Sequence, residues 1–337
     1  QNYLEVFSSS MRILVTGATG KVGQACISEI LQSSNFDNAS IVAFCHNRTL
    51  NPHDRIKVIK GSIADQKTVT EALEGITHVI HLATCKETPE AVMDVTVKGL
   101  FWLLEECRKS STFEHFILVG GDASMGHFFY DHPVPVTETQ RHTAYPGCYA
   151  LSKVLEEVML EQYQIQYDFP GTCLRAPWIM EKDDFKFSLS FGKDVFGGPV
   201  WRDLIDENEA NQYHKDGTIP LMLDSKDIPI KRNFVHVDDL VAAILCTILN
   251  PVPAKGQTFN ICMDEPVDYE QVSKYLKKTR NIESVPVNTK YCSTWLDNTK
   301  AKFLLDWSPK VSLYELIDRS WNYSRNEEDV RKIWYPG

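Results

Sequence analysis

The sequence lacks the features that mark membrane-spanning and nucleic-acid-binding proteins. It contains no run of about eighteen consecutive apolar residues, so no segment qualifies as a membrane-spanning helix. Basic residues are not in excess, because 35 Lys and Arg stand against 45 Asp and Glu and give a formal net charge of -10. A negatively charged protein does not attract phosphate backbones. We therefore expect neither nucleic acid nor a membrane as a partner.

The cysteines and histidines lack the spacing of disulfide frameworks and metal sites. Nine cysteines are scattered without a C-x-x-C pair, and their number is odd. No HExxH motif occurs and the ten histidines are dispersed, so no metal site is expected. Residues 1–10 lack the basic start and apolar stretch of a secretion signal, and we interpret them as an N-terminal extension or a cloning scar. These features favour a reducing, cytoplasmic location.

What the sequence does contain is a regular alternation of strand-like and helix-like segments. With 337 residues, 43% of them hydrophobic and 24% charged, the chain is long enough for about two domains. Short apolar runs rich in β-branched residues alternate with amphipathic stretches of helix length, which is the pattern of a parallel sheet covered by helices on both faces. The expected strands are residues 12–16, 40–44, 56–59, 77–82, 115–119 and 257–262.

The alternation stops after residue 180, and this predicts a second, smaller lobe. Residues 181–231 mix glycine, proline, aromatic and charged residues without a sustained period. We therefore predict an α/β fold with a Rossmann-type doubly wound parallel sheet in residues 11–180 and about 232–262. A smaller α/β substrate-binding lobe is predicted in residues 181–231 and 263–337.

A glycine-rich turn follows the first expected strand and leads into a helix. Glycine allows a phosphate to approach the backbone closely, and the helix N-terminus presents free N–H groups at its positive end. This order of strand, turn and helix predicts a site for the diphosphate of NAD(P). The residues predicted to form it are Gly17, Thr19, Gly20, Lys21, Val22 and Gly23.

The end of the second strand distinguishes NAD from NADP. An acidic residue there accepts the ribose hydroxyls of NAD, whereas a basic residue faces the extra phosphate of NADP. This chain has no carboxylate at that point but has His46 and Arg48, which favours NADP(H); Arg48 as a solvated loop residue is an equal alternative. Ser62 and Ile63 follow the third strand, where they either contact the adenine or merely end the strand.

Tyr149 and Lys153 are the candidate catalytic pair. They lie four residues apart in an expected helix, so both side chains leave the same face about one turn apart. A nearby ammonium group stabilises a phenolate, and a tyrosine in that setting serves as a general acid and base.

The order of these motifs resembles the extended short-chain dehydrogenase/reductase family, which includes NDP-sugar epimerases and dehydratases. The resemblance runs from Met11 to about Leu313 and rests on TGATGKVG at 16–23, HLAT at 81–84, YALSK at 149–153, LRAPW at 174–178, RNFVHVDDL at 232–240 and DNTKAKFLLDWSPKVSL at 297–313. It implies that Tyr149 exchanges a proton with a substrate hydroxyl or carbonyl, and that Lys153 binds the nicotinamide ribose and tunes Tyr149. Further cofactor contacts are implied for Leu82, Ala83, Thr84, Lys86 and Pro177.

One departure from the family pattern concerns the reacting oxygen of the substrate. The family usually has a Ser or Thr five residues before Gly126, but this chain has Gly121 there. We expect Asp122 or Ser124 to make the missing contact; a loop hydrogen bond is the equal alternative for Ser124. Dehydratases of the family carry an Asp-Glu pair just after that hydroxyl. Asp122 is followed by alanine instead, which disfavours dehydration.

A second departure concerns the nucleotide part of the substrate. UDP-sugar enzymes of the family usually hold the diphosphate with an asparagine after the LRP-like strand, and this chain has Trp178 there. Arg232 keeps another phosphate-facing position. Lys86 lies where a family lysine approaches the cofactor diphosphate or the substrate; a solvated loop lysine is the alternative. The loss of the asparagine favours a substrate smaller than a sugar nucleotide.

Three functional hypotheses follow from these residues. The first is an NAD(P)-dependent oxidoreductase that acts on a hydroxyl or carbonyl of a small, sugar-like compound, with Tyr149, Lys153 and either Asp122 or Ser124 at the reacting oxygen. The second is an NDP-sugar 4-epimerase with tightly bound NAD, and the third is a non-catalytic NAD(P)-sensing regulator, motivated by Gly121. By resemblance, residues 96–109 and 149–163 are the helices through which a homodimer would form.

Overall fold

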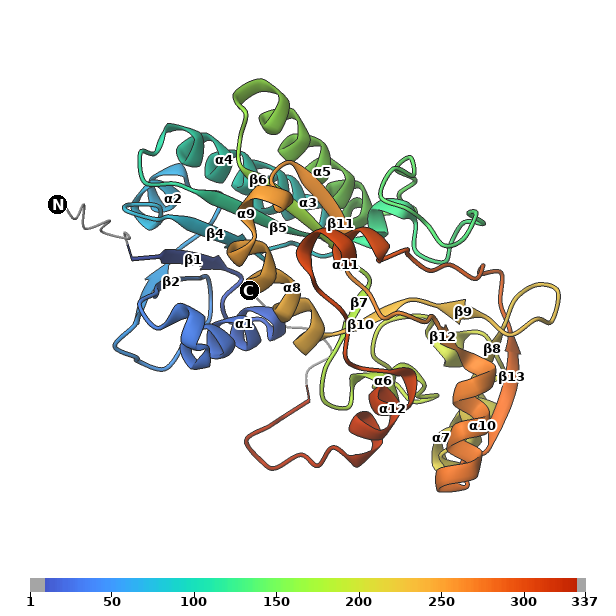
Figure 1. The fold of residues 1–337 in the computed structure, drawn as a ribbon. Helices are drawn as coiled ribbons and strands as arrows, with labels where there is room; N and C mark the ends of the chain where they lie inside the picture. The colour runs from blue at the N-terminus through green and yellow to red at the C-terminus, as the bar shows by residue number, and fades with distance from the viewer. Residues whose placement is uncertain (1–9, 332–337) are drawn as a thin grey trace.

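A computed structural model describes residues 10–331, and its centre is a sheet of seven strands (Figure 1). The strands are β1 (Arg12–Thr16), β2 (Ser40–Cys45), β3 (Ile56–Lys60), β4 (His78–His81), β5 (His115–Gly121), β6 (Gly171–Ala176) and β11 (Gln257–Asn260). Their order is β11-β6-β5-β4-β1-β2-β3, and all neighbouring pairs are parallel. The predicted doubly wound parallel sheet is confirmed.

Helices cover both faces of this sheet. On one face α1 (Lys21–Gln32), α8 (Val237–Leu249) and α11 (Thr299–Leu305) share an apolar cluster with the strands. On the other face α2 (Gln66–Ala72), α4 (Gly99–Lys109) and α5 (Cys148–Tyr167) form a second cluster. Because side chains on both faces are buried, the strands read as nearly continuous apolar runs in the sequence. In residues 10–331 no helix combines the length and apolar character needed to cross a bilayer.

Short elements connect these layers. They are the 3₁₀ turns Ser34–Phe36, Asp122–Met125 and Trp201–Asp203, the helices α3 (Pro89–Val92) and α9 (Pro251–Ala254), and a π-helical segment, Met93–Lys98, that joins α3 to α4.

A third apolar cluster lies beside the sheet and gathers the side chains of the lobe, including Phe185, Trp201 and Phe234. Its helices are α6 (Asp184–Ser188), α7 (Glu207–Asp216), α10 (Tyr269–Arg280) and α12 (Leu313–Asn322). Its strands form three pairs, which are β7 (Trp178–Met180) with β10 (Phe234–His236), β8 (Ile219–Leu223) with β13 (Ser284–Asn288), and β9 (Lys231–Arg232) with β12 (Val267–Asp268).

One helix from the C-terminal part of the chain packs against the sheet and not in the lobe. Helix α11 lies within residues 263–337, yet Ala301, Leu305 and Trp307 are buried in the cluster of the sheet, against α8. The indole N–H of Trp307 donates to the carbonyl oxygen of Asp239 at 3.0 Å. The chain therefore returns to the sheet before it forms α12 of the lobe.

The strand order reverses between β1 and β4, which are neighbours although β2 and β3 separate them along the chain. In such sheets ligands bind outside the carboxyl ends of the strands at the point of reversal. Thr16 and His81 are the last residues of these two strands, and the candidate site is built around them.

Candidate active site

The glycine-rich turn has a backbone that requires glycine at two positions. Gly17 has a φ of +62°, and a Cβ atom added there would lie 3.0 Å from the Ala83 nitrogen. A Cβ atom on Gly23 would lie 2.3 Å from the Gly17 carbonyl oxygen. The N-cap of α1 is Gly20, so no side chain occupies the N–H groups of the first turn. These residues fit the diphosphate of a dinucleotide, which such a helix end binds through backbone N–H groups.

A hydrogen-bonded cluster holds the end of β4 against this turn. The Thr16 hydroxyl accepts from the Leu82 and Ala83 nitrogens at 2.9 and 3.1 Å, so its own proton points to Nδ1 of His81, 2.7 Å away. Burial, with a smaller effect of Lys153, lowers the pKa of His81 to about 3, and the ring is neutral. The neighbouring Thr84 hydroxyl is buried without a hydrogen-bond partner in the described chain, which suits a ligand contact.

The residues predicted at the adenosine end of the cofactor differ in whether they contact the glycine turn. Arg48 donates from Nη2 to the Thr19 carbonyl oxygen of the glycine turn, and therefore lies at the mouth of the cofactor site. The Ser62 hydroxyl accepts from the Ala64 nitrogen at 3.2 Å, and Ile63 is buried against Gly99. His46 is exposed. Of these residues, Arg48 contacts the glycine turn directly.

Lys21 has a structural contact that the sequence did not indicate. Its ammonium group donates to the Ile179 carbonyl oxygen at 3.0 Å and to Asp184 Oδ2 at 2.9 Å. The side chain thus ties the glycine turn to helix α6 of the lobe, which leaves the backbone of Lys21 to face a diphosphate. Pro177 lies between β6 and β7, at the same junction of sheet and lobe.

Tyr149 lies in the first turn of α5 and is positioned by a residue from a distant loop. The N-cap of α5 is Gly147, and the Glu87 carboxylate accepts from the Cys148 and Tyr149 nitrogens at 3.1 and 3.2 Å in place of a capping side chain. The ammonium groups of Lys86 and Lys153 lie 4.7 and 5.6 Å from the centre of the Tyr149 ring. Two positive charges therefore lie within cation–π distance of the phenol ring.

Lys153 has a buried acidic partner one turn further along α5. Its ammonium group lies 3.2 Å from Oε2 of Glu156, and the two residues are 5% and 1% exposed. Burial opposes the charge of Lys153, but Glu156 and Tyr149 outweigh it, and the pKa of Lys153 is raised. Burial also raises the pKa of Glu156 to about 7. Lys153 is therefore a cation at neutral pH.

Ser124 belongs to a separate buried network. Its hydroxyl lies 2.9 Å from the Gly121 carbonyl oxygen and 2.8 Å from Oε2 of Glu157. Glu157 also accepts from Arg175, with a shortest contact of 2.6 Å. The contacts of Ser124 are thus those of a loop hydrogen bond, and the residue does not line the pocket described next.

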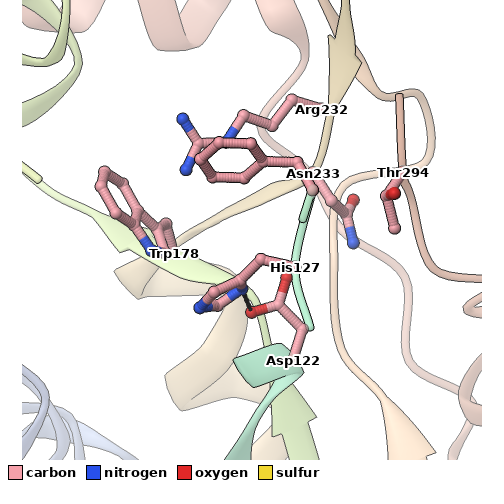
Figure 2. Close-up of a pocket in the computed structure, with 7 residues that line it drawn as sticks. Asp122, His127, Trp178, Arg232, Asn233 and Thr294 are labelled. Atoms are coloured by element: carbon pink, nitrogen blue, oxygen red, sulfur yellow. Dashed lines mark ion pairs between the residues drawn. The ribbon is translucent and has the colours of Figure 1, made fainter. Parts of the chain in front are cut away.

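The pocket beside the 3₁₀ turn Asp122–Met125 contains the other candidate (Figure 2). Asp122 Oδ1 forms an ion pair with Nδ1 of His127, and the imidazole stacks on Tyr145 with 5.1 Å between ring centres. The cavity volume of the pocket is about 10 Å³, which is room for about one water molecule and far below the about 300–1,000 Å³ typical of sites for drug-sized ligands. Its lining residues are Asp122, His127, Phe128, Trp178, Arg232, Asn233 and Thr294.

His127 and Glu87 are site residues that the sequence reasoning missed. His127 follows Gly126 directly in the loop where the family hydroxyl is absent, and that placement was a usable signal. Glu87 stands beside Lys86, but its contact with α5 joins residues 61 positions apart. No local pattern predicts such a contact.

Position 121 lies opposite Tyr149, the candidate catalytic tyrosine. A Cβ atom added to Gly121 would be 3.9 Å from the Tyr149 hydroxyl oxygen, and the backbone there is extended, with φ -146° and ψ 151°. A serine side chain would therefore reach the reacting centre without strain. The hydroxyl that the family pattern has at this place is absent from the wall of the site next to Tyr149, and Asp122 is the adjacent residue.

Trp178 and Arg232 close the pocket on the side of the lobe (Figure 2). The guanidinium carbon of Arg232 lies 4.4 Å from the Trp178 ring centre and 4.0 Å from that of Phe128, and Nη1 donates to the Gly198 carbonyl oxygen at 2.8 Å. The indole also contacts Phe196 and Phe234 edge to face. Trp178 is therefore a fixed wall of the pocket.

The wall depends on Gly197. This residue has a φ of +71°, and a Cβ atom added to it would lie 1.7 Å from the Trp178 ring. We expect Gly197→Ala to displace the indole, to cost about 1–3 kcal/mol of unfolding free energy, and to change substrate selectivity. Gly217→Ala serves as the control, because its φ is +69° but its added Cβ meets no atom within 4 Å. Equal chemical-denaturation curves and equal selectivity for the two variants would contradict this role.

Comparison with known proteins gives consistent matches. The model of the NAD dependent epimerase/dehydratase family matches residues 13–180. Vestitone reductase of Medicago sativa is 24% identical over 79% of this chain and 80% of its own length. An uncharacterized UDP-glucose epimerase of Bacillus subtilis (strain 168) is also 24% identical, over 90% of this chain and 94% of its own.

Two solved structures illustrate the likeness of the fold. A short-chain dehydrogenase/reductase superfamily protein from Agrobacterium tumefaciens with bound NAD superposes with a TM-score of 0.75 at 19% identity, covering 92% of this chain and 95% of its own. UDP-glucuronic acid 4-epimerase from Bacillus cereus in complex with NAD gives a TM-score of 0.71 at 20% identity, covering 93% and 98%. At this level of identity the superposition establishes a common fold.

Proposed function

Because the chain belongs to the NAD dependent epimerase/dehydratase family and is an enzyme of the short-chain dehydrogenase/reductase class, we propose that it is an NAD(P)-dependent reductase of a small carbonyl compound, or the dehydrogenase of the corresponding alcohol. The observation that carries the proposal is the wall of Trp178 and Arg232, which closes the pocket beside Asp122 to a volume of only about 10 Å³. A compact, sugar-like substrate suits this pocket better than a sugar nucleotide, and the reductase among the relatives supports the same reaction class.

The residues of the site have distinct roles in this proposal. When bound, the cofactor supplies or accepts a hydride at its nicotinamide ring. The Tyr149 hydroxyl gives a proton to the carbonyl oxygen of the substrate, and in the reverse direction takes it back. Lys153 and Lys86 stabilise the phenolate that remains, since both ammonium groups lie within 6 Å of the ring. Asp122, oriented by His127, accepts a hydrogen bond from a substrate hydroxyl.

We further propose that NADPH is the preferred cofactor. Arg48 at the mouth of the site, together with the absence of a carboxylate after β2, supports a contact with the 2′-phosphate. The reducing cytoplasm is the proposed location. A homodimer through α4 and α5 is also proposed, and the exposed apolar side chains of Phe101, Leu151, Val158 and Ile165 on these helices support it.

The test is a panel of small aldehydes, ketones and sugars incubated with NADPH and the purified protein. We expect multiple turnovers, seen as loss of NADPH absorbance, with at least one compact carbonyl substrate. An NDP-sugar 4-epimerase is the second candidate, and Arg232, a phosphate-capable side chain in the pocket, favours it. Conversion of UDP-glucose with no net change in cofactor would establish the epimerase instead.

The contact to the substrate hydroxyl is tested by Asp122→Asn. The amide keeps the shape of the side chain but removes its charge and the ion pair with His127, so kcat/KM should fall about 10- to 100-fold, the value of one charged hydrogen bond. Ser124→Ala is the matched control, because Ser124 bonds to Glu157 outside the pocket. A larger loss of turnover in Ser124→Ala than in Asp122→Asn would reverse the two assignments.

A further inference from the structure

The segment that follows α12, residues 323–331, is fastened to the start of α6 by ion pairs. Arg325 Nη2 lies 2.5 Å from Oδ1 of Asp183, and Lys182 Nζ lies 3.1 Å from Oδ1 of Asp329. The next residue, Asp184, holds the ammonium group of Lys21 in the glycine turn. The C-terminal segment is therefore linked, through two acidic neighbours, to the turn that faces the cofactor diphosphate.

An open cavity of about 520 Å³ separates this segment from the nucleotide side of the sheet. Gln24 of α1 and Arg48 after β2 line one side of it, and Asn326, Glu328, Asp329 and Val330 line the other, with Lys182 between them. In Figure 1 the same segment is the red loop that leaves α12 and turns back toward the sheet domain. The cavity is large enough for a sizeable part of a nucleotide.

Arg331 follows Val330 of the cavity lining, and its guanidinium group has no anionic partner in residues 10–331. All three of its guanidinium nitrogens are buried, and none has a hydrogen-bond partner in residues 10–331. The group lies 3.8 Å from the Phe187 ring centre and 5.7 Å from that of Phe196, and Lys21 Nζ lies 4.5 Å from the same Phe196 ring. Arg331 and Lys21 therefore both lie within 6 Å of the Phe196 ring, and Lys21 belongs to the glycine turn.

The acidic groups near Arg331 already have partners. Asp183 pairs with Arg325, Asp184 pairs with Lys21, and Asp194 accepts from the Ser190 hydroxyl at 2.9 Å. Burying a guanidinium group without hydrogen bonds is costly, and arginine does not escape the cost by losing its proton near neutral pH. A planar group with several N–H donors in this state is suited to phosphate oxygens.

We propose that residues 323–331 complete the cofactor site and that Arg331 binds the diphosphate of NAD(P). The inference rests on the cofactor part of the proposed function and is independent of the substrate. It assigns a positive charge from the C-terminal segment to the same diphosphate that the N-terminus of α1 faces.

The test is the dissociation constant of four ligands, measured by calorimetry for the full chain and its variants. In Arg331→Gln the constants for NADPH, NADH and ADP-ribose should rise about 10- to 100-fold, the range of one charge-assisted hydrogen bond, while adenosine binding should not change. Arg331→Lys keeps the positive charge and should therefore lose less affinity for these three ligands than Arg331→Gln. Arg280→Gln, at the end of α10, is the control and should bind all four ligands like the wild type.

Each other outcome is decisive. Unchanged affinities in Arg331→Gln would overturn the inference alone, and a loss confined to NADPH would reassign Arg331 to the 2′-phosphate. A wild-type chain that binds none of the nucleotides would overturn the proposed function as well. If the Arg331→Gln variant does not fold, hydrogen exchange is measured on the wild-type protein instead. NADPH should then slow exchange in residues 323–331, adenosine should not, and equal exchange with both would contradict the inference.

Discussion

Replacing Tyr149 with phenylalanine is expected to reduce kcat by about 10²- to 10⁴-fold, the contribution of a positioned general acid. The hydroxyl is the group beside position 121, and Lys86 and Lys153 flank its ring within 6 Å. The Tyr149 hydroxyl is therefore the proposed source of the proton for the substrate oxygen.

Tyr145→Phe is the matched control for this experiment. Tyr145 is a neighbouring half-buried tyrosine that stacks on His127 and Phe129, and burial, together with the nearby Tyr149, raises the pKa of its hydroxyl. Its ring, rather than its hydroxyl, makes these contacts, so the variant should keep most of its turnover. Cofactor affinity should be retained in both variants. Turnover that survives in Tyr149→Phe but is lost in Tyr145→Phe would contradict the assignment.

Glu157→Gln is expected to lower the free energy of unfolding by about 3–5 kcal/mol, because it leaves a buried charge on Arg175 without its partner. Arg175 Nη2 lies 2.6 Å from Oε1 of Glu157, and both residues are buried between α5 and β6. Ser124 adds a hydrogen bond to the same carboxylate. Urea denaturation of the variant measures the loss, and a midpoint equal to that of the wild type would contradict it.

The neighbouring Glu156 provides a comparison, because its contribution to stability should depend on pH in the opposite direction. Although burial opposes ionisation of Glu157, His142, Arg175 and Ser124 lower its pKa to about 2, so its contribution is present above about pH 4.5 and is lost as pH falls toward 2. Burial raises the pKa of Glu156 to about 7, so ionising it costs stability as pH rises from about 4.5 through 7. The advantage of wild type over Glu157→Gln should grow between about pH 2 and 4.5. Its advantage over Glu156→Gln should shrink between about pH 4.5 and 7.

The sequence predicted the parts of this protein that local patterns determine. The strands and the glycine turn have their own periodicity and residue types, and the spacing of Tyr149 and Lys153 follows from one helix. Asp122 and Trp178 were also identified, because each occupies a position where the family pattern departs. Both line the pocket.

The remaining features depend on contacts between distant parts of the chain. Glu87 acts on α5 from 61 residues away, and Lys21 reaches Asp184 across 163 residues. The choice between Asp122 and Ser124 depends on which way each side chain turns, and the structure turns Ser124 toward Glu157. Such side-chain orientations arise from tertiary packing, which cannot be predicted from residue types or from the periodicity of the sequence.

The central claim is that a dissociable nicotinamide cofactor is consumed by reduction of a small substrate. The most direct measurement is to denature the purified protein, identify any released nucleotide by mass spectrometry, and titrate fresh protein with NADPH and NADH. We predict no stoichiometric retained nucleotide and tighter binding of NADPH, in agreement with the position of Arg48 beside Thr19. One equivalent of NAD that stays bound through repeated conversion of UDP-glucose would contradict the claim and identify an internally recycling epimerase.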